Sequence, residues 1–341
     1  MGRNDSCFVD ALSFTRKSLV FFITLLFVGV SFYNISFAQA QKGEEEEEIM
    51  TYKVDFWLPP TIRNHYSYNE RTEVTRVYSD SSVFTYSREL TYFYNVKAPN
   101  PRNEGFTTLE ITLDSMKYKF KKGEYEYSYN SQGSEPANFK LTDCLANVVP
   151  LGNFFTITYS PYGNVSKLEG EELEEFLQSS VIDKKDAFEP IDYFVWKDGL
   201  SNERLIHIAD FKKIHYPHFE IAEDSAFISP IVFQLNHINI RDTVDMTFED
   251  ISGGYMTFGG SFSGVKYFND KVRFEGIDNY MVDVEAVDAK GTVETILTPR
   301  GTPEETTLLV DMDVTGKVKM EVFTEKVVSA MKWELLGQWE Y

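Results

Sequence analysis

Apolar and aromatic side chains recur at every second position over long stretches of this 341-residue chain. Between Tyr52 and about Gln132 the sequence is dense in tyrosine, phenylalanine, valine and threonine, and turn clusters such as Ser79-Asp80-Ser81-Ser82 separate the dense stretches. Successive side chains of a strand point to opposite faces, so a period of two is typical of β-strands with one buried face. The pattern returns from about Pro230 onward, and we therefore expect a mainly β fold.

One hairpin can be predicted residue by residue, with Lys122-Gly123 as its loop. A single register sorts apolar pairs onto one face and opposite charges onto the other, as paired antiparallel strands require. The apolar pairs are Met116 with Tyr129, Tyr118 with Tyr127 and Phe120 with Tyr125, and the charged pairs are Lys119 with Glu126 and Lys121 with Glu124.

Two further hairpins are expected. One follows the strand Phe155–Tyr159 and reverses at Ser160-Pro161-Tyr162-Gly163, where proline and glycine stand at the positions that a tight turn uses. The other has Thr315-Gly316-Lys317 as its loop. Its register places Val310 opposite Val322, Met312 opposite Met320 and Val314 opposite Val318.

Helical spacing is confined to the middle of the chain. We expect one helix over Glu171 to Ser179, and a second that begins after the capping residue Ser201 and ends before Pro217. The order of strands, helices and strands favours two curved antiparallel sheets or half-barrels with a helical middle segment. The expected regions are an N-terminal antiparallel β region over 51–169, the helical middle over 170–229 and a C-terminal antiparallel β region over 230–341.

The first forty residues predict export. Arg16 and Lys17 precede an apolar run from Leu19 to Phe32, and Ala38-Gln39-Ala40 follows. This is the pattern of a signal peptide over residues 1–40 that is cleaved near Ala40, which would release a periplasmic or secreted protein. The alternative is an uncleaved membrane anchor, because Leu19 to Ala38 is long enough to span a bilayer.

Acidic side chains outnumber basic ones. The chain has 33 basic and 53 acidic side chains, and residues 1–40 contain three of the basic and two of the acidic ones. The remainder therefore has 30 basic and 51 acidic side chains, a net charge of −21 before histidine is counted. Such a molecule repels phosphate, so we expect no nucleic acid as a partner, whereas neutral ligands or other envelope proteins are compatible. The block Glu44 to Glu48 predicts an acidic disordered linker over 41–50.

Three short segments carry a family resemblance. They are Ser160-Pro161-Tyr162-Gly163-Asn164-Val165, then Arg241-Asp242-Thr243-Val244, and then Asp311-Met312-Asp313-Val314-Thr315-Gly316. Their layout resembles a family of uncharacterised exported bacterial β-rich proteins, which is itself similar to the open half-barrels of periplasmic lipoprotein carriers. In that family the middle segment tends to read glycine, aspartate, threonine and tryptophan, so Arg241 and Val244 depart from it. The resemblance implies an envelope protein without assigned catalytic residues.

Four of the five histidines lie close together in the sequence: His207, His215, His218 and His237. Imidazole is a common zinc ligand, and a turn at Tyr216-Pro217 would let these side chains share one ion in a metal-dependent enzyme. The alternative is a set of interfacial histidines at a helix end, because the i, i+4 histidine pair of helical zinc motifs is missing.

Two other patterns approach catalytic or metal-binding motifs. Asp311-Met312-Asp313-Val314-Thr315-Gly316 matches the first half of a calcium loop, but Val322 stands where the loop needs a glutamate. Gly260-Ser261-Phe262-Ser263-Gly264 approximates the serine elbow of hydrolases, yet it lies in a glycine-rich stretch that favours a flexible β turn. Cys144, beside Leu141 and Leu145, is expected to be a small buried apolar residue. We therefore expect a non-catalytic protein without a cofactor.

The chain has 20 tyrosines and 28 phenylalanines, which could line a cleft for a lipid or another apolar small molecule. The candidate lining residues are Tyr118, Phe120, Tyr125, Tyr127 and Phe176. The alternative is that these rings only fill the core.

The last strand suggests a different protein class. Val327, Met331, Trp333, Leu335, Trp339 and Tyr341 share one alternation, which resembles the closing strand of an outer-membrane β-barrel that ends in Tyr341. Otherwise this is the closing strand of a soluble sheet, with Trp333 and Trp339 in the core.

Overall fold

A computed structural model describes residues 50–138, 140–152, 154–170, 198–277, 280–299 and 301–340. The predicted signal peptide, the acidic linker except Met50, the helix expected over Glu171 to Ser179 and the terminal Tyr341 lie outside the described residues.

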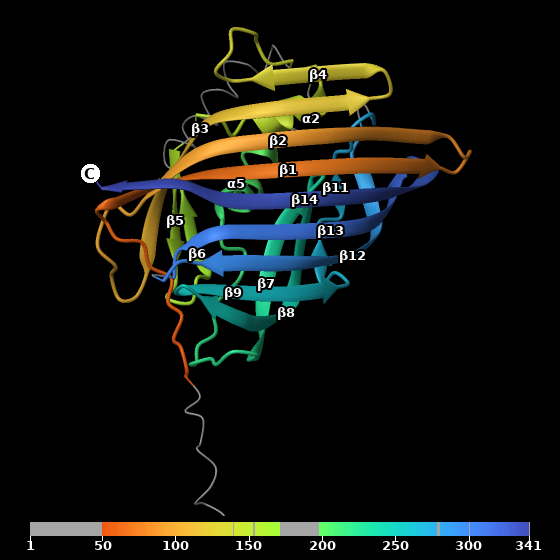
Figure 1. Cartoon of the computed structure of the whole chain (residues 1–341). Helices are drawn as coiled ribbons and strands as arrows, with labels where there is room; N and C mark the ends of the chain where they lie inside the picture. The colour runs from red at the N-terminus through yellow and green to blue at the C-terminus, as the bar shows by residue number, and fades with distance from the viewer. Residues whose placement is uncertain are drawn as a thin grey trace, which may run out of the picture. The chain divides into compact units, whose positions relative to one another are not determined.

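Fourteen strands of the described chain form one antiparallel sheet (Figure 1). The strands are β1 (Ile62–Tyr78), β2 (Val83–Lys97), β3 (Thr107–Lys122), β4 (Tyr125–Asn130), β5 (Phe154–Tyr159), β6 (Val165–Glu169), β7 (Ala226–Leu235), β8 (Ile238–Ser252), β9 (Tyr255–Ser263), β10 (Tyr267–Phe268), β11 (Lys271–Val272), β12 (Val282–Leu297), β13 (Pro303–Val318) and β14 (Glu321–Glu340). The main order is β10-β8-β9-β12-β13-β14-β1-β2-β3-β5-β6, and β4, β7 and β11 pair with β3, β8 and β12. The predicted mainly β, antiparallel fold is confirmed.

The pairing of β14 with β1 joins the two β regions into one sheet. It runs from Ile62 opposite Glu340 to Tyr78 opposite Phe323, and Figure 1 shows the dark blue β14 beside the orange β1. Strands from the two ends of the described chain thus meet at the centre of the sheet. The sheet is not closed into a barrel, because the strand order begins at β10 and ends at β6.

The long strands have one buried and one solvated face, as their alternation predicts. In β14, Val327, Met331 and Trp333 are buried on the face that we call inner. The outer face carries ion pairs between neighbouring strands, with Lys326 3.0 Å from Asp311.

Two helices lie on the inner face: α2 (Thr142–Val148) and α5 (Asn202–Ala209). The indole of Trp333 donates a 2.9 Å hydrogen bond to the carbonyl of Ile208, which fixes α5 against β14. Ser201 caps α5 as predicted, because its hydroxyl accepts a hydrogen bond from the backbone of Arg204. The helix ends at Ala209, earlier than the end expected before Pro217.

The middle region differs in two ways from the expected helical segment. Strand β7 already begins at Ala226, inside the region expected over 170–229. Helix α2 was not predicted. Its N-cap residue, Leu141, has a side chain that cannot cap a helix, so the N-cap signal used for α5 is missing there. Within the described residues, no helix has the length and hydrophobicity needed to cross a membrane.

The β3–β4 hairpin forms, but its predicted register is wrong by two residues. Tyr118 pairs with Tyr129 and Phe120 with Tyr127, and the loop is Gly123-Glu124. A shift of two keeps every side chain on its predicted face, so alternation alone cannot detect it. The ring of Tyr118 still packs against its predicted partner Tyr127, with centroids 6.1 Å apart.

The predicted loop at Thr315-Gly316-Lys317 is wrong. Strand β13 continues through Gly316 to Val318, and Val310, Met312 and Val314 face Ser329, Val327 and Glu325. The reason is local packing: a side chain at Gly316 would collide with the ring of Phe323, so this glycine serves close packing within the strand.

The other two turn predictions have opposite outcomes. The reversal at Ser160-Pro161-Tyr162-Gly163 is confirmed, because β5 pairs with β6 there and Gly163 has a positive φ of 79°. The flexible turn expected around Ser261 and Ser263 is wrong, since both serines belong to β9, which pairs with β8 and β12.

Candidate functional site at the turn between β7 and β8

The turn between β7 and β8 consists of Asn236 and His237, and both have a positive φ, 50° and 68°. Two-residue hairpin turns favour Asn-Gly in this conformation, because glycine has no side chain to clash. Histidine at the second position is strained by about 1 kcal/mol or more. Strain of this kind persists only where the surroundings enforce it, and it is concentrated at functional sites.

Two contacts hold His237 in this conformation. Its Nδ1 lies 2.9 Å from a carboxylate oxygen of Asp198, and its backbone carbonyl accepts a 3.2 Å hydrogen bond from the side-chain amide of Asn269. The imidazole is nearly buried, whereas Asp198 is partly exposed. The pair therefore lies at a boundary between the interior and solvent.

A cleft of about 330 Å³ opens beside this pair, and we call it the turn cleft. Leu200, Val272 and Met281 form its apolar wall. The polar lining residues are Asp198, Ser201, Asn202, His237, Asn269, Lys271 and Arg273. This volume and this mixture are typical of small-molecule sites, which are apolar with a few placed polar groups.

Two cationic side chains, Lys271 and Arg273, and one carboxylate, that of Asp198, line the turn cleft. The N-terminus of α5, at Ser201 and Asn202, borders it with the positive end of the helix dipole. Lys271 is exposed, and its ammonium lies 3.7 Å from the carboxylate of Asp283. Arg273 is buried and donates to the carbonyls of Ile277 and Tyr280, so its position is fixed.

A smaller cavity of about 10 Å³ lies beneath the turn cleft. It shares Asp198 and His237 with the cleft and is also lined by Arg88, Ala146, Asn147, Gly199, Arg204, Gln234 and Asn236. This volume is about that of one water molecule. The Nε of Arg88 is buried and has no hydrogen-bond partner among the described residues, so a water here would satisfy it.

Buried ion pairs surround this cavity. Arg88 donates to the carboxylates of Glu70 and Asp143, and the hydroxyl of Tyr118 donates to Asp143 at 2.6 Å. Burial alone would raise the pKa of Glu70, but the charges of Arg88 and Arg204 outweigh it and lower that pKa below its usual value. The floor of the site is thus a neutralised, hydrogen-bonded network.

Asn236 anchors the turn to the inner face of the sheet. Its side-chain oxygen accepts from the hydroxyl of Tyr86, and its amide donates to Glu325. Glu325 is paired in turn with Arg76, whose guanidinium lies 2.6 Å away. The position of the turn is therefore set by three strands, β1, β2 and β14.

The predicted metal site was built on four histidines, which lie in separate environments. His207 is buried: its Nδ1 accepts from the backbone of Gln234 at 3.1 Å, and its Nε2 lies 2.7 Å from the hydroxyl of Tyr68. Both ring nitrogens are therefore engaged, and burial with the nearby Lys213 lowers the pKa of His207 well below its usual value.

The other histidines have different neighbours. Burial lowers the pKa of His215 to about 4, with the charge of Lys212 as a second cause, and the ring of His218 packs on Tyr162 with centroids 3.6 Å apart. No three His, Cys, Asp or Glu side chains of the described ranges are placed to share a metal ion. The structure therefore gives the predicted metal centre no support.

The residues predicted to line an apolar cleft are placed elsewhere. Tyr118 and Phe120 are buried in the core, Tyr125 is exposed, Tyr127 is half-buried and Phe176 lies outside the described residues. None of the four described rings borders either cavity of the candidate site. Cys144 is buried as predicted, and burial raises the pKa of its thiol to about 12.

Sequence reasoning missed the turn cleft. Its lining residues come from three separated parts of the chain, around Asp198, around His237 and between Asn269 and Met281. One signal was available: Asn236-His237 separates two apolar, alternating runs, which is the pattern of a two-residue hairpin turn.

No protein-family model matches the chain, and no curated protein sequence matches it. Among solved structures, the chain is similar to lipovitellin, with 9% identity and a TM-score of 0.42 over 83% of this chain. The chain spans about a quarter of lipovitellin, 26% of its length. It also matches an outer membrane channel from Pseudomonas putida F1, with 6% identity and a TM-score of 0.24 over 86% of this chain and 100% of the channel. These are distant resemblances between β-rich folds.

Proposed function

We propose that this chain is an exported, non-catalytic binding protein of the cell envelope, and that the turn cleft is its binding site. The ligand class is an amphiphile with an apolar part and an anionic group, such as a fatty acid. The observation that carries the proposal is the joining of an apolar wall to cationic groups in one cleft of an otherwise acidic molecule.

The apolar wall supports a ligand with a hydrocarbon part. Met281 is substantially exposed at the cleft and offers apolar surface that a ligand can cover, whereas Leu200 and Val272 are already buried. Covering exposed apolar surface contributes roughly 25 cal/mol per Å², so a chain of methylene groups would be stabilised against this wall.

The charges support an anionic group. The lining of the turn cleft has two cationic side chains, Lys271 and Arg273, against one carboxylate, that of Asp198, whereas the chain as a whole carries a net charge of −20. Because the carboxylate of Asp198 accepts from the Nδ1 of His237, the Nε2 of the neutral ring is an acceptor, and the exposed ammonium of Lys271 is the donor for an anionic group.

The hydrogen bonding of the cleft supports a non-catalytic role. A side-chain nucleophile for the histidine that Asp198 orients would have to come from the described lining residues, where the hydroxyl that borders the cleft belongs to Ser201. That hydroxyl caps α5 by accepting from the backbone of Arg204.

The outer face of the sheet supports an aqueous compartment over the outer-membrane alternative. Cross-strand ion pairs such as Lys326 with Asp311, 3.0 Å apart, lie on this face about midway along β13. Charged side chains are destabilising on a surface that faces lipid. Osmotic shock should release the protein, whereas its retention in detergent-extracted membranes would favour the alternative.

Calorimetric titration with sodium dodecanoate below its micelle concentration tests the site, with dodecanol as the uncharged comparison. We expect dodecanoate to bind, and Lys271→Gln and Met281→Gln each to weaken its affinity by about tenfold. Met320→Gln is the matched control, because Met320 is 95% exposed in the β13–β14 turn and does not line the cleft. Absence of dodecanoate binding, or equal affinity in all variants, would contradict the proposal.

A further inference from the structure

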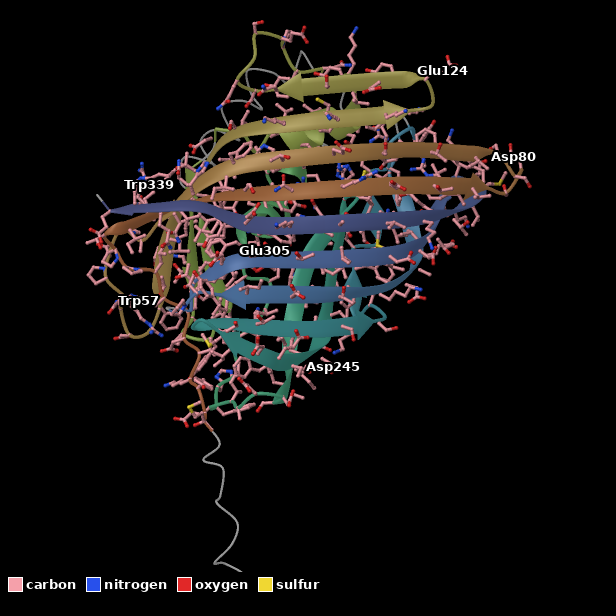
Figure 2. All side chains as sticks on the ribbon, viewed as in Figure 1. Trp57, Asp80, Glu124, Asp245, Glu305 and Trp339 are labelled. Atoms are coloured by element: carbon pink, nitrogen blue, oxygen red, sulfur yellow. The ribbon has the colours of Figure 1, made fainter. Side chains whose placement is uncertain are left out.

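A second cleft, of about 410 Å³, lies at the end of the sheet that carries Trp339, and we call it the end cleft (Figure 2). It is formed where β1 begins, β14 ends, β9 begins and β12 turns into β13. Its lining residues are Pro59, Ile62, Tyr255, Thr298, Pro299, Thr302, Gln338, Trp339 and Glu340.

Two aromatic rings of the end cleft are open to solvent. Trp339 is 44% exposed and Tyr255 is 40% exposed. Large aromatic side chains contribute most when they are covered, so rings left open at a cleft are available for a ligand. Trp57 is also exposed, and Figure 2 places it at the same end of the molecule; its carbonyl accepts a 3.3 Å hydrogen bond from Thr302 of the cleft.

A β-bulge turns Trp339 outward. Tyr66 pairs with Leu335 and the next pair is His65 with Gly337, so Leu336 is an extra residue in β14. Beyond it the inward and outward faces exchange, which is why the predicted core position of Trp339 is wrong. Bulges re-aim side chains and are frequent beside functional sites. The ring of His65 lies 6.1 Å from that of Trp339 and supports it.

The polar groups of the end cleft are neutral or acidic. Gln338, Thr298 and Thr302 offer amide and hydroxyl groups, Glu340 offers a carboxylate, and the described lining residues include no lysine or arginine. The carboxylate of Glu340 repels anions, and the amide and hydroxyl groups suit a neutral polar ligand. Hydroxyl groups can both donate to Glu340 and exchange hydrogen bonds with Gln338.

We propose that the end cleft binds a neutral oligosaccharide. A pyranose ring has a flat face of C–H groups that covers an aromatic ring, and hydroxyls around its edge that need donors and acceptors. Trp339 and Tyr255 meet the first requirement, and Gln338 with Glu340 meets the second. The site is separate from the turn cleft, with which it shares no lining residue.

Titration with cellohexaose, maltohexaose and chitohexaose, followed by calorimetry and tryptophan fluorescence, tests the proposal. We expect at least one of them to bind, and Trp339→Ala to weaken its affinity by about tenfold or more. Tyr255→Ala is a second variant with the same expected direction. Tyr125→Ala is the matched control, because Tyr125 is similarly exposed but lies on β4, outside the lining of the cleft.

Two results would overturn the saccharide proposal. One is the absence of binding by all three saccharides at millimolar concentration. The other is unchanged affinity in Trp339→Ala and Tyr255→Ala when circular dichroism shows both variants folded. Binding of choline chloride at Trp339 without saccharide binding would also reject it, and would identify a site for organic cations.

Discussion

Arg76 shows how one buried cation is accommodated among aromatic residues. Its guanidinium carbon lies between 5.0 and 5.9 Å from four ring centroids and its Nη2 lies 2.6 Å from Glu325. The four rings belong to Tyr78, Phe84, Phe274 and Phe323. Burial raises the pKa of Glu325 and Arg76 opposes that rise, so the pair is stable only when both members are present.

We predict that Arg76→Met lowers the free energy of unfolding by about 3–5 kcal/mol, because it leaves the buried carboxylate of Glu325 without its cation. The double variant Arg76→Met with Glu325→Gln should recover much of this loss, since glutamine retains an oxygen for the amide of Asn236. Urea unfolding of the three proteins provides the comparison. Equal losses in the single and double variants would contradict the explanation.

Lys213 gives a prediction on pH. It is buried, with its ammonium 2.8 Å from the carbonyl of His207 and 4.6 Å from the ring centroid of Trp333. Burial lowers its pKa from 10.5 to about 7, more than the nearby Asp210 restores it. Between these two pKa values the unfolded chain keeps a proton that the folded chain has lost, so stability rises with pH.

We expect the free energy of unfolding to rise by about 2 kcal/mol from pH 7 to pH 9 because of Lys213, and Lys213→Met to lack this contribution. The range ends at pH 9 because above it the thiol of Cys144, with an unfolded pKa of 9.0 and a raised folded pKa, offsets the contribution of Lys213. The difference between wild type and variant, measured by urea unfolding, isolates Lys213. If the free energy of unfolding changes with pH equally in wild type and in Lys213→Met, the pKa of Lys213 is not lowered in the folded protein.

At the scale of elements, a substitution in the β7–β8 turn is expected to affect ligand affinity and folding stability in different directions. His237→Gly removes the side-chain strain of a positive φ and should keep or raise stability by up to about 1 kcal/mol. It also removes the pair with Asp198, so affinity for dodecanoate should fall. Ser81→Gly is the control, because Ser81 has a φ of 68° in the β1–β2 turn, does not line the turn cleft and should gain stability without any change in affinity. Equal dodecanoate affinity in both variants would show that His237 is only structural.

The strands and their buried faces could be predicted from the sequence better than the pairing between strands could. Alternation identified the buried face of β3 and β14, yet it left the β3–β4 register wrong by two residues, because such a shift preserves both faces. Gly316 was interpreted as a turn residue, although its function is close packing against Phe323. The bulge at Leu336 moves the side chain of Trp339 from the predicted inner face to the outer face, and a single sequence carries no signal for such a bulge.

The candidate site was harder to predict than the fold. The clustering of histidines in the sequence suggested a metal centre, but the chain places His207 in the core and His218 against Tyr162. The turn cleft depends on segments that meet only after the sheet has formed. Sequence periodicity carries no information about contacts between distant segments. The dipeptide Asn236-His237, however, identifies the hairpin turn that borders the turn cleft.

For the whole molecule, the continuity of the sheet predicts cooperative unfolding. Strand β14 pairs with β1 and β13 over its length, so neither β region has a complete hydrogen-bonded sheet alone. We expect one urea transition, with far-UV circular dichroism and tryptophan fluorescence coincident, because Trp333 reports on the core that both regions share. Two separated transitions would indicate that the regions fold independently.

The central position of β14 in the sheet also determines when the sheet can be completed during synthesis. Strand β1 needs β14 as a neighbour, yet nearly the whole described chain must be made before β14 exists. Until then one edge of β1 exposes backbone groups that attract other chains. A nascent polypeptide of this design keeps that edge open until its last strand is made, so its ribosome-bound stages need protection from aggregation.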